Sequence, residues 1–152
     1  METDLSKRKD STNTLLDGIF RASALDDFIK KHEDALRLPT LSEYLDALCR
    51  EKRMMRVEVV RRAGIDRSFG FQIFQGAKNP SRDKIIQLAV GFRLGYEEAQ
   101  ALLKIAQKPA LYPRIKRDAA VIYCLNRHLS FTDTQAVLSG MDMAVLGKER
   151  DC

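Results

Sequence analysis

The sequence predicts an all-α protein, and three observations support this expectation. Only 8 glycines and 4 prolines interrupt the 152 residues, and the alternation of apolar and polar residues that marks strands is hard to find. Apolar residues recur instead at the spacing of three and four that places them on one face of a helix. Several of these stretches begin with Thr, Ser or Asp, which are the residues that cap helix N-termini.

Four segments follow one another along the chain. Residues 1–11 are polar and aperiodic and are predicted to form a flexible tail. Residues 12–39 contain two amphipathic stretches, which we expect to form an N-terminal helical hairpin. Residues 40–108 contain five predicted helices, and residues 109–152 form a C-terminal helical extension. The apolar residues of the N-terminal hairpin are Leu15, Leu16, Ile19, Phe20, Leu25, Phe28, Ile29 and Leu36.

The helices of the third segment are delimited by capping residues. The first begins with Thr40 and Glu43, whose Thr-x-x-Glu spacing is that of a capping box. The third covers about 67–75, with Asp66 as its N-cap and Gly76 as its C-cap. These assignments predict two short helices joined by a tight turn in the middle of the segment.

A repeat of 35 residues links the last two segments. Arg82–Leu103 aligns with Arg117–Leu138 at a constant offset of 35, with six identical residues. The turn residues match as well as the apolar positions, although two unrelated amphipathic hairpins can also align by chance. We expect a repeat of the fourth and fifth core helices, whose second copy stacks on the first and extends the core.

The formal net charge of +5 is concentrated in one part of the chain. Residues 1–40 carry 7 Lys and Arg against 8 Asp and Glu, residues 41–108 carry 13 against 8, and residues 109–152 carry 6 against 5. Binding to nucleic-acid phosphates requires a basic surface of this kind, although a solvated helix face gives the same pattern. The basic residues are densest at Arg50, Lys52, Arg53, Arg56, Arg61 and Arg62.

The composition also bears on where the protein resides. The longest apolar runs are far shorter than a membrane span, and the segment after Met1 lacks the apolar core of a secretory signal. The three cysteines form no CxxC pair, which favours reduced thiols, two of them buried and one terminal. We therefore expect a cytoplasmic protein with no membrane partner. The cysteines are Cys49, Cys124 and Cys152.

The middle of the chain resembles the lambda-repressor-like (XRE-family) helix-turn-helix domain of bacterial and phage regulators. The stretch VVRRAGIDRSFGFQIFQGAKNPSRDKIIQLAVGFRL carries the resemblance, which covers about 65 of the 152 residues. The linked Ala-Gly turn and Gly-x-x-x-Pro segment make it fairly specific. The matching positions are Ala63, Gly64, Ile65, Ile73, Gly76, Asn79, Pro80, Ser81, Leu88 and Ala89.

The resemblance implies a five-helix domain that binds double-stranded DNA in transcription regulation. The third helix of the family lies in the major groove, and the second helix and the following loop hold phosphates. Carried over by position, the base-contacting residues are Arg67, Ser68, Phe71 and Gln72. The phosphate-contacting residues are Arg56, Lys78 and Asn79. The second-helix N-terminus would add backbone N–H groups.

The third helix departs from the family pattern in two ways. Gly70 stands where an aliphatic residue is usual, so we expect a packing gap that Phe69 or Phe71 fills. Phe74 replaces a residue that is usually polar. If the three phenylalanines were exposed, they would form an apolar patch, which marks a protein contact more often than a DNA contact. The alternative function is therefore a non-enzymatic adaptor that binds a protein partner through this helix.

The sequence gives no indication of an enzyme. His32 and His128 lie in different predicted helices without a second metal ligand at suitable spacing, so no metal site is expected. No Gly-rich phosphate loop is present, so no cofactor is expected. Cys124 lies on an apolar stripe and is interpreted as a core thiol rather than as a nucleophile.

Two apolar segments outside the helix-turn-helix core are candidates for a homodimer interface. One is the N-terminal hairpin, and the other is the C-terminal segment. Either surface would also serve to cover the core of a monomer, and the sequence leaves these alternatives open. The C-terminal apolar residues are Leu138, Met141, Met143, Val145 and Leu146.

Overall fold

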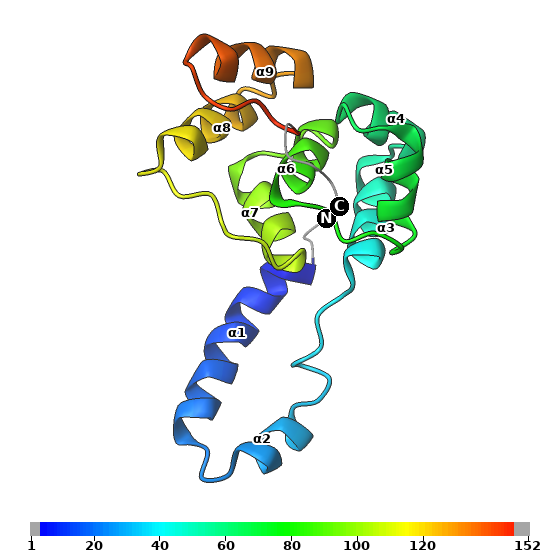
Figure 1. Ribbon diagram of the computed structural model, residues 1–152. Helices are drawn as coiled ribbons and strands as arrows, with labels where there is room; N and C mark the ends of the chain where they lie inside the picture. Colours follow the sequence, from blue (N-terminus) through cyan, green and yellow to red (C-terminus); the bar gives the residue numbers. More distant parts are fainter. Residues whose placement is uncertain (1–3, 148–152) are drawn as a thin grey trace. The chain divides into compact units, whose positions relative to one another are not determined.

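The computed structural model describes the backbone of residues 4–147 and the side chains of residues 12–147. Within that range the chain is all-helical, with nine helices and no strand, which confirms the predicted all-α class (Figure 1). The chain forms two compact units, residues 1–39 and residues 40–152. The expected terminal position of Cys152 lies outside the described residues.

The first unit consists of α1 (Asp4–Arg21) and α2 (Leu25–Lys31). The segment 1–11, which the sequence predicts as a flexible tail, is helical from Asp4 onward. It contains no glycine or proline and several good helix formers, so its polar character alone does not end a helix. The polarity of these residues was therefore a poor guide to their conformation.

Helix α2 is shorter than its apolar pattern suggests. It ends at Lys31, and Leu36 lies in the turn that follows. The backbone N–H of His32 donates to the carbonyl of Phe28, and the ring Nδ1 of His32 lies 3.0 Å from the same oxygen. The two rings are also stacked, with their centroids 4.3 Å apart. His32 thus ends the helix by bonding back onto its last turn.

The described part of the second unit contains seven helices, and the N-caps predicted at Thr40 and Asp66 are confirmed, whereas the C-cap of α5 is Gln75 and the predicted Gly76 follows it. Thr40 and Glu43 form the reciprocal capping box, and the side chains of Asp66, Ser81 and Ser130 each accept a backbone N–H of the helix that follows. The helices are α3 (Leu41–Lys52), α4 (Arg56–Arg62), α5 (Arg67–Phe74), α6 (Arg82–Gly91), α7 (Tyr96–Ile105), α8 (Lys116–Asn126) and α9 (Phe131–Gly140).

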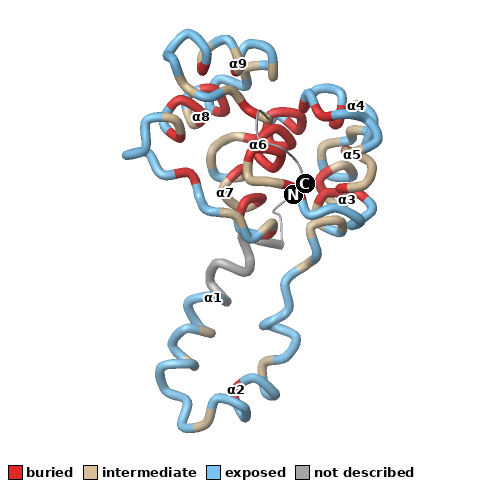
Figure 2. The backbone as a smooth tube through the Cα atoms, in the orientation of Figure 1, coloured by how far each residue is buried: buried red, intermediate tan, exposed pale blue. Residues whose placement is uncertain are grey.

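Helix α6 is the centre of this unit. Every residue from Asp83 to Gly91 is buried, because α4, α7 and α9 all pack against it (Figure 2). The buried residues include the polar Asp83, Lys84 and Gln87. Because an unpaired buried charge is costly, the elements packed around α6 must supply hydrogen-bond partners or counter-charges for these groups.

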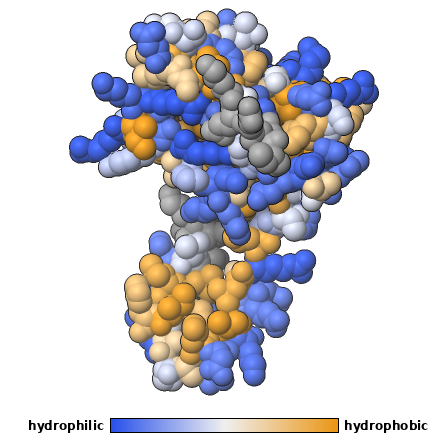
Figure 3. Space-filling model, viewed as in Figure 1, coloured by the Kyte–Doolittle hydropathy of each residue, from blue (hydrophilic) through white to orange (hydrophobic). Residues whose placement is uncertain are grey.

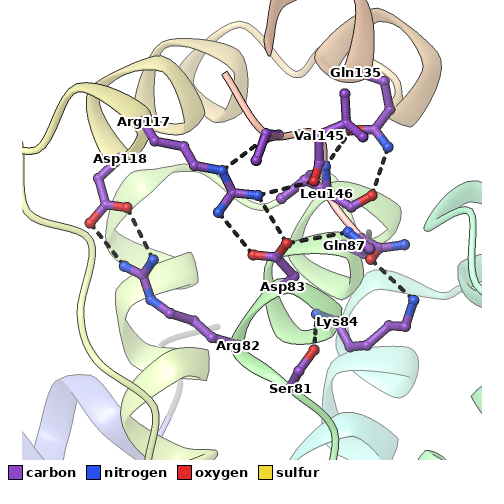
Figure 4. A network of polar contacts seen from close by, with 12 residues as sticks. Ser81, Arg82, Asp83, Lys84, Gln87, Arg117, Asp118, Gln135, Val145 and Leu146 are labelled. Atoms are coloured by element: carbon purple, nitrogen blue, oxygen red, sulfur yellow. Dashed lines mark hydrogen bonds and ion pairs between the residues drawn. The ribbon is translucent and has the colours of Figure 1, made fainter. Parts of the chain in front are cut away.

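The partners of Asp83 come from the second half of the repeat. Arg117 donates to both carboxylate oxygens of Asp83, at 3.0 and 2.9 Å. Thirty-five residues away the roles are exchanged, and Arg82 donates to both oxygens of Asp118, at 3.0 and 2.9 Å (Figure 4). The Arg-Asp pair that begins each half of the repeat therefore binds the Arg-Asp pair of the other half.

The segments that follow the hairpins α6–α7 and α8–α9 are held by equivalent hydrogen bonds. The side chain of Gln100 exchanges two hydrogen bonds with the backbone of Leu111, and Gln135 does the same with Leu146. Arg82 donates to the carbonyls of Pro109 and Ala110, and Arg117 to those of Ala144 and Val145. The N–H of Tyr112 donates to Asp118, and that of Gly147 to Asp83.

Every one of these contacts recurs at an offset of 35 residues, which agrees with the predicted repeat. The contacts of Asp83 and Asp118 are also reciprocal between the halves, so the hairpins α6–α7 and α8–α9 are related by a local two-fold. The hairpin α8–α9 extends the core, because Leu138 and the following Leu146 belong to the same cluster of buried apolar residues. A reciprocal contact of this kind closes on itself, so it does not provide a surface for a third hairpin.

We expect Asp118→Asn to lower the free energy of unfolding by about 3 kcal/mol, because it leaves the guanidinium of Arg82 without its counter-charge. Urea denaturation followed by circular dichroism measures this change. Glu58→Gln is the matched control, since the Arg62–Glu58 pair is more exposed and should contribute less than about 1 kcal/mol. Equal losses in the two variants would contradict the role given to Asp118.

The same carboxylate should make stability depend on pH. Burial raises the pKa of Asp118, but hydrogen bonds from Arg82 and the Tyr112 N–H, with the charges of Arg82 and Arg117, lower the pKa below its usual value. A lowered folded-state pKa gives a stabilisation that is present above about pH 4 and is lost as the pH falls through the folded-state pKa. Asp118→Asn should remove this part of the acid dependence.

Candidate nucleic-acid interface

A tight turn joins α4 to α5. Gly64 has φ +69°, a left-handed conformation that favours glycine, and Ile65 is buried behind it. A Cβ at Gly64 would lie 2.4 Å from the ring of Phe131, so the turn and α9 are in close contact. Asp66 then accepts the backbone N–H of Phe69 at 3.1 Å and starts α5. These features fix where α5 begins.

Helix α5 has a buried face and a solvent face. Gly70, Ile73 and Phe74 are buried against the rest of the unit. Of the four residues predicted to contact bases, Arg67 and Ser68 are exposed, whereas Phe71 and Gln72 are half-buried. The four lie within the first six residues of the helix, and the guanidinium carbon of Arg67 lies 5.6 Å from the centre of the Phe71 ring. They are thus near one another on the accessible part of α5.

The prediction of a packing gap at Gly70 is wrong. A Cβ at this position would lie 2.4 Å from Cγ1 of Val60, so the space is already filled by a side chain of α4. The two helices approach so closely here that glycine is required by sterics, and the cost of glycine in a helix is offset by this contact. Neither Phe69 nor Phe71 is needed to fill the site.

The three phenylalanines do not form an exposed patch. Phe74 is completely buried and belongs to the core, and Phe69 is half-buried and packs against the same core. Phe71 is the third, and it is also half-buried. The burial of Phe74 removes one of the three rings from the patch on which the adaptor alternative rests, whereas Phe69 and Phe71 stay partly accessible, so the adaptor function stays a prediction.

Arg56 has partners within the chain. Its guanidinium donates three hydrogen bonds of 2.9–3.1 Å to the carboxylate of Asp46, and it lies 5.4 Å from the centre of the Phe74 ring. Arg56 therefore covers the edge of the core next to α5. The N-cap residue of α4 is Met55, which provides no side-chain hydrogen bond to this helix, unlike the N-cap residues of α3 and α5.

The loop after α5 carries the other two predicted phosphate contacts. Lys78 and Asn79 are both exposed, whereas Pro80 between them and α6 is buried. The Ser42 hydroxyl donates to the carbonyl of Phe74 and holds the end of α5 against α3. The loop is thus anchored at both ends, and its basic tip faces solvent.

Ion pairs reduce the basic surface that the sequence indicates. Three of the six densest basic residues are paired with carboxylates. The other three, Arg50, Arg53 and Arg61, are exposed and form no ion pair with any residue that the structure describes. The paired residues are Lys52 with Glu98 at 2.8 Å, Arg56 with Asp46 at 2.9 Å, and Arg62 with Glu58 at 3.2 Å.

Gln87 positions the turn, and the sequence analysis missed it. Its Nε2 donates to the carbonyl of Ala63 at 3.0 Å and lies 3.4 Å from that of Gly64, from a site that is almost completely buried. The same amide lies against the C-terminal segment, because a Cβ at Gly147 would be 2.8 Å from its Oε1. A polar residue within the apolar run of α6 was the feature that could have identified it.

Metal sites and nucleophilic sites require ligating and ionisable side chains of particular kinds. Among the described residues, no group of three or more His, Cys, Asp or Glu side chains could hold a metal ion. Burial raises the pKa of Cys124, and burial followed by the charge of Asp46 raises the pKa of Cys49. Both thiols are therefore weaker nucleophiles at neutral pH than a free cysteine. Burial, with the charges of Glu51 and Glu98, likewise raises the pKa of Tyr44 to about 12.

No protein-family model, no curated protein and no solved structure matches the chain. The likeness to the lambda-repressor-like family therefore rests on the residues quoted above and stays a prediction. In the part of the chain that the structure describes, no helix has the length and apolar character needed to cross a membrane.

We expect Gly70→Ala to lower the free energy of unfolding by about 1–2 kcal/mol. The overlap with Val60 costs about 1–3 kcal/mol, and the better helix propensity of alanine returns at most about 1 kcal/mol. Gly140→Ala is the matched control, because a Cβ at the end of α9 meets no atom within 4 Å. Denaturant titration of both variants checks this, and an unchanged or raised stability for Gly70→Ala would contradict the close approach.

Proposed function

We propose that the chain is a sequence-specific DNA-binding transcriptional regulator of the lambda-repressor-like (XRE) type found in bacteria. In this proposal α3 to α7 form the five-helix domain, and α5 enters the major groove of double-stranded DNA. The single observation that carries the proposal is the division of α5 into a face buried in the core and an accessible face with Arg67 and Gln72.

The side chains on the accessible face are suited to base edges. Arginine can donate two hydrogen bonds to guanine, and glutamine can exchange two with adenine. Phe71 lies between Arg67 and Gln72 in the helix and can contact a thymine methyl group. Lys78 and Asn79 in the next loop would contact phosphates and set the register of α5 on the duplex.

The basic residues without a carboxylate partner supply the electrostatic part of the interaction. Arg50, Arg53 and Arg61 are exposed around α3 and α4, the helices that support α5. Phosphate contacts by such residues release counterions, so the proposal requires DNA affinity to fall steeply with salt concentration. No enzymatic step, cofactor or metal enters the proposal.

We expect Gln72→Ala to lower affinity for a cognate duplex by about 1–3 kcal/mol and to leave affinity for an unrelated duplex unchanged, because the substitution removes no charge. The probe is a duplex selected by the wild-type protein from a randomised pool, and fluorescence anisotropy measures binding. Arg67→Ala should weaken both complexes, with the larger loss for the selected duplex.

Two charge variants complete this experiment. Lys78→Ala should weaken both complexes equally and reduce the slope of log affinity against log salt by about 0.9, as expected for one phosphate contact. Lys104→Ala removes the same charge from an exposed site on α7 and serves as the control. Absence of salt-dependent binding by the wild type, or equal losses for both duplexes in Gln72→Ala, would refute the proposal.

A further inference from the structure

The two apolar segments that the sequence offers for a dimer differ in exposure. In the C-terminal segment Leu138 and Leu146 are buried and Met143 and Val145 pack against the core, so Met141 is the one large apolar side chain of this segment that is exposed. The N-terminal hairpin is different. Five of its large apolar side chains from α1 and α2 are exposed, with Phe20 at 74% and Leu25 at 64%.

These exposed residues form one apolar face on each helix of the hairpin. Leu16, Ile19 and Phe20 have the spacing of one helix face on α1, and Leu25 and Ile29 have that spacing on α2. We call these five residues the apolar face of the hairpin. Figure 3 shows hydrophobic residues gathered on one side of this unit and hydrophilic residues on the other. Monomeric proteins rarely expose a continuous apolar area of this kind.

The N-terminal hairpin is too small to be stable as an isolated unit with its apolar face exposed. The unit ends at Pro39, and Phe28 is its one buried side chain among the described residues. Units below about 40 residues usually need a disulfide, a metal or association with another surface. Residues 1–39 contain no cysteine, and the described residues hold no metal-binding group. Association is therefore the remaining means of stabilising it.

The charges on α2 select a second copy of the same hairpin. The first turn of this helix carries Asp26 and Asp27, and the last turn carries Lys30 and Lys31. All four side chains are exposed. At 3.6 residues per turn, Asp26 and Lys30 lie toward one edge of the face formed by Leu25 and Ile29, whereas Asp27 and Lys31 lie away from it. When two such helices pack antiparallel through this face across a two-fold axis, Asp26 of each lies near Lys30 of the other. Two-fold contacts require this self-complementarity.

We propose that the N-terminal hairpins of two chains pack through their apolar faces with α2 antiparallel to its copy, and that this contact makes the protein a homodimer. The four helices then form a bundle with a shared apolar core, and Asp26 of each chain pairs with Lys30 of the other at its edge. This inference does not depend on DNA binding, because it rests on the first unit alone.

The first test is the mass of the full chain in solution by light scattering over a range of concentrations. The wild type should have twice the chain mass of 17.3 kDa, and Phe20→Glu should have the mass of one chain. Met141→Glu, at another exposed apolar residue, should stay dimeric and is the control. A monomeric wild type, or a dimeric Phe20→Glu, overturns the proposal. Docking of the hairpin on its own chain or on a different protein would give the monomeric result.

A charge exchange tests the antiparallel arrangement. The variant Asp26→Lys/Asp27→Lys has four basic residues on α2, and Lys30→Asp/Lys31→Asp has four acidic ones. Each variant alone should dimerise less than the wild type, and an equimolar mixture should form heterodimers with a mass of two chains. Circular dichroism of each variant verifies that the helices of the second unit are retained. A mixture no more associated than its components overturns the antiparallel pairing.

Discussion

The complete burial of α6 is the constraint on which the second unit depends. A helix that is covered on every side needs neighbours around it, and here α4, α7 and α9 provide them. Because Asp83 and Gln87 are polar, the covering layers must also bring specific partners. Arg117 and the backbone of the α4–α5 turn supply them. The C-terminal hairpin is thus part of the core, and a domain that stopped at residue 108 would leave Asp83 without its counter-ion.

The same constraint connects the second hairpin to the proposed DNA-binding helix. The side chain of Gln87 donates a hydrogen bond to the carbonyl of Ala63 in the α4–α5 turn, and the ring of Phe131 in α9 packs on Gly64. The start of α5 is therefore set by residues from α6 and α9 as well as by its own N-cap. Small displacements of α9 would move the turn, because a packed interface offers little free volume. The hairpin α8–α9 thus helps to fix the position of α5 and of its accessible face.

The features that could be predicted from the sequence are local or periodic. Helix caps at Thr40, Asp66 and Ser81 depend on neighbouring residues, and the repeat is visible as a constant offset. What could not be predicted depends on distances between helices. The gap expected at Gly70 presumed ordinary spacing, whereas α4 lies close enough for Val60 to fill it. The burial of Phe74 likewise follows from how α5 sits on the core, and its sequence context gave no indication of that orientation.

The number of basic residues is also a poor measure of a basic surface. Half of the densest cluster is paired with carboxylates, and Arg56, assigned to a phosphate by position, bonds to Asp46 and stacks on Phe74. Exposed pairs of this kind contribute little to stability, about 1 kcal/mol or less, so a phosphate can replace the carboxylate at small cost. The pairing is therefore compatible with a place for Arg56 in the proposed DNA interface. In the proposed complex it would keep the guanidinium oriented next to α5, and most of the initial attraction to DNA would come from Arg50, Arg53 and Arg61.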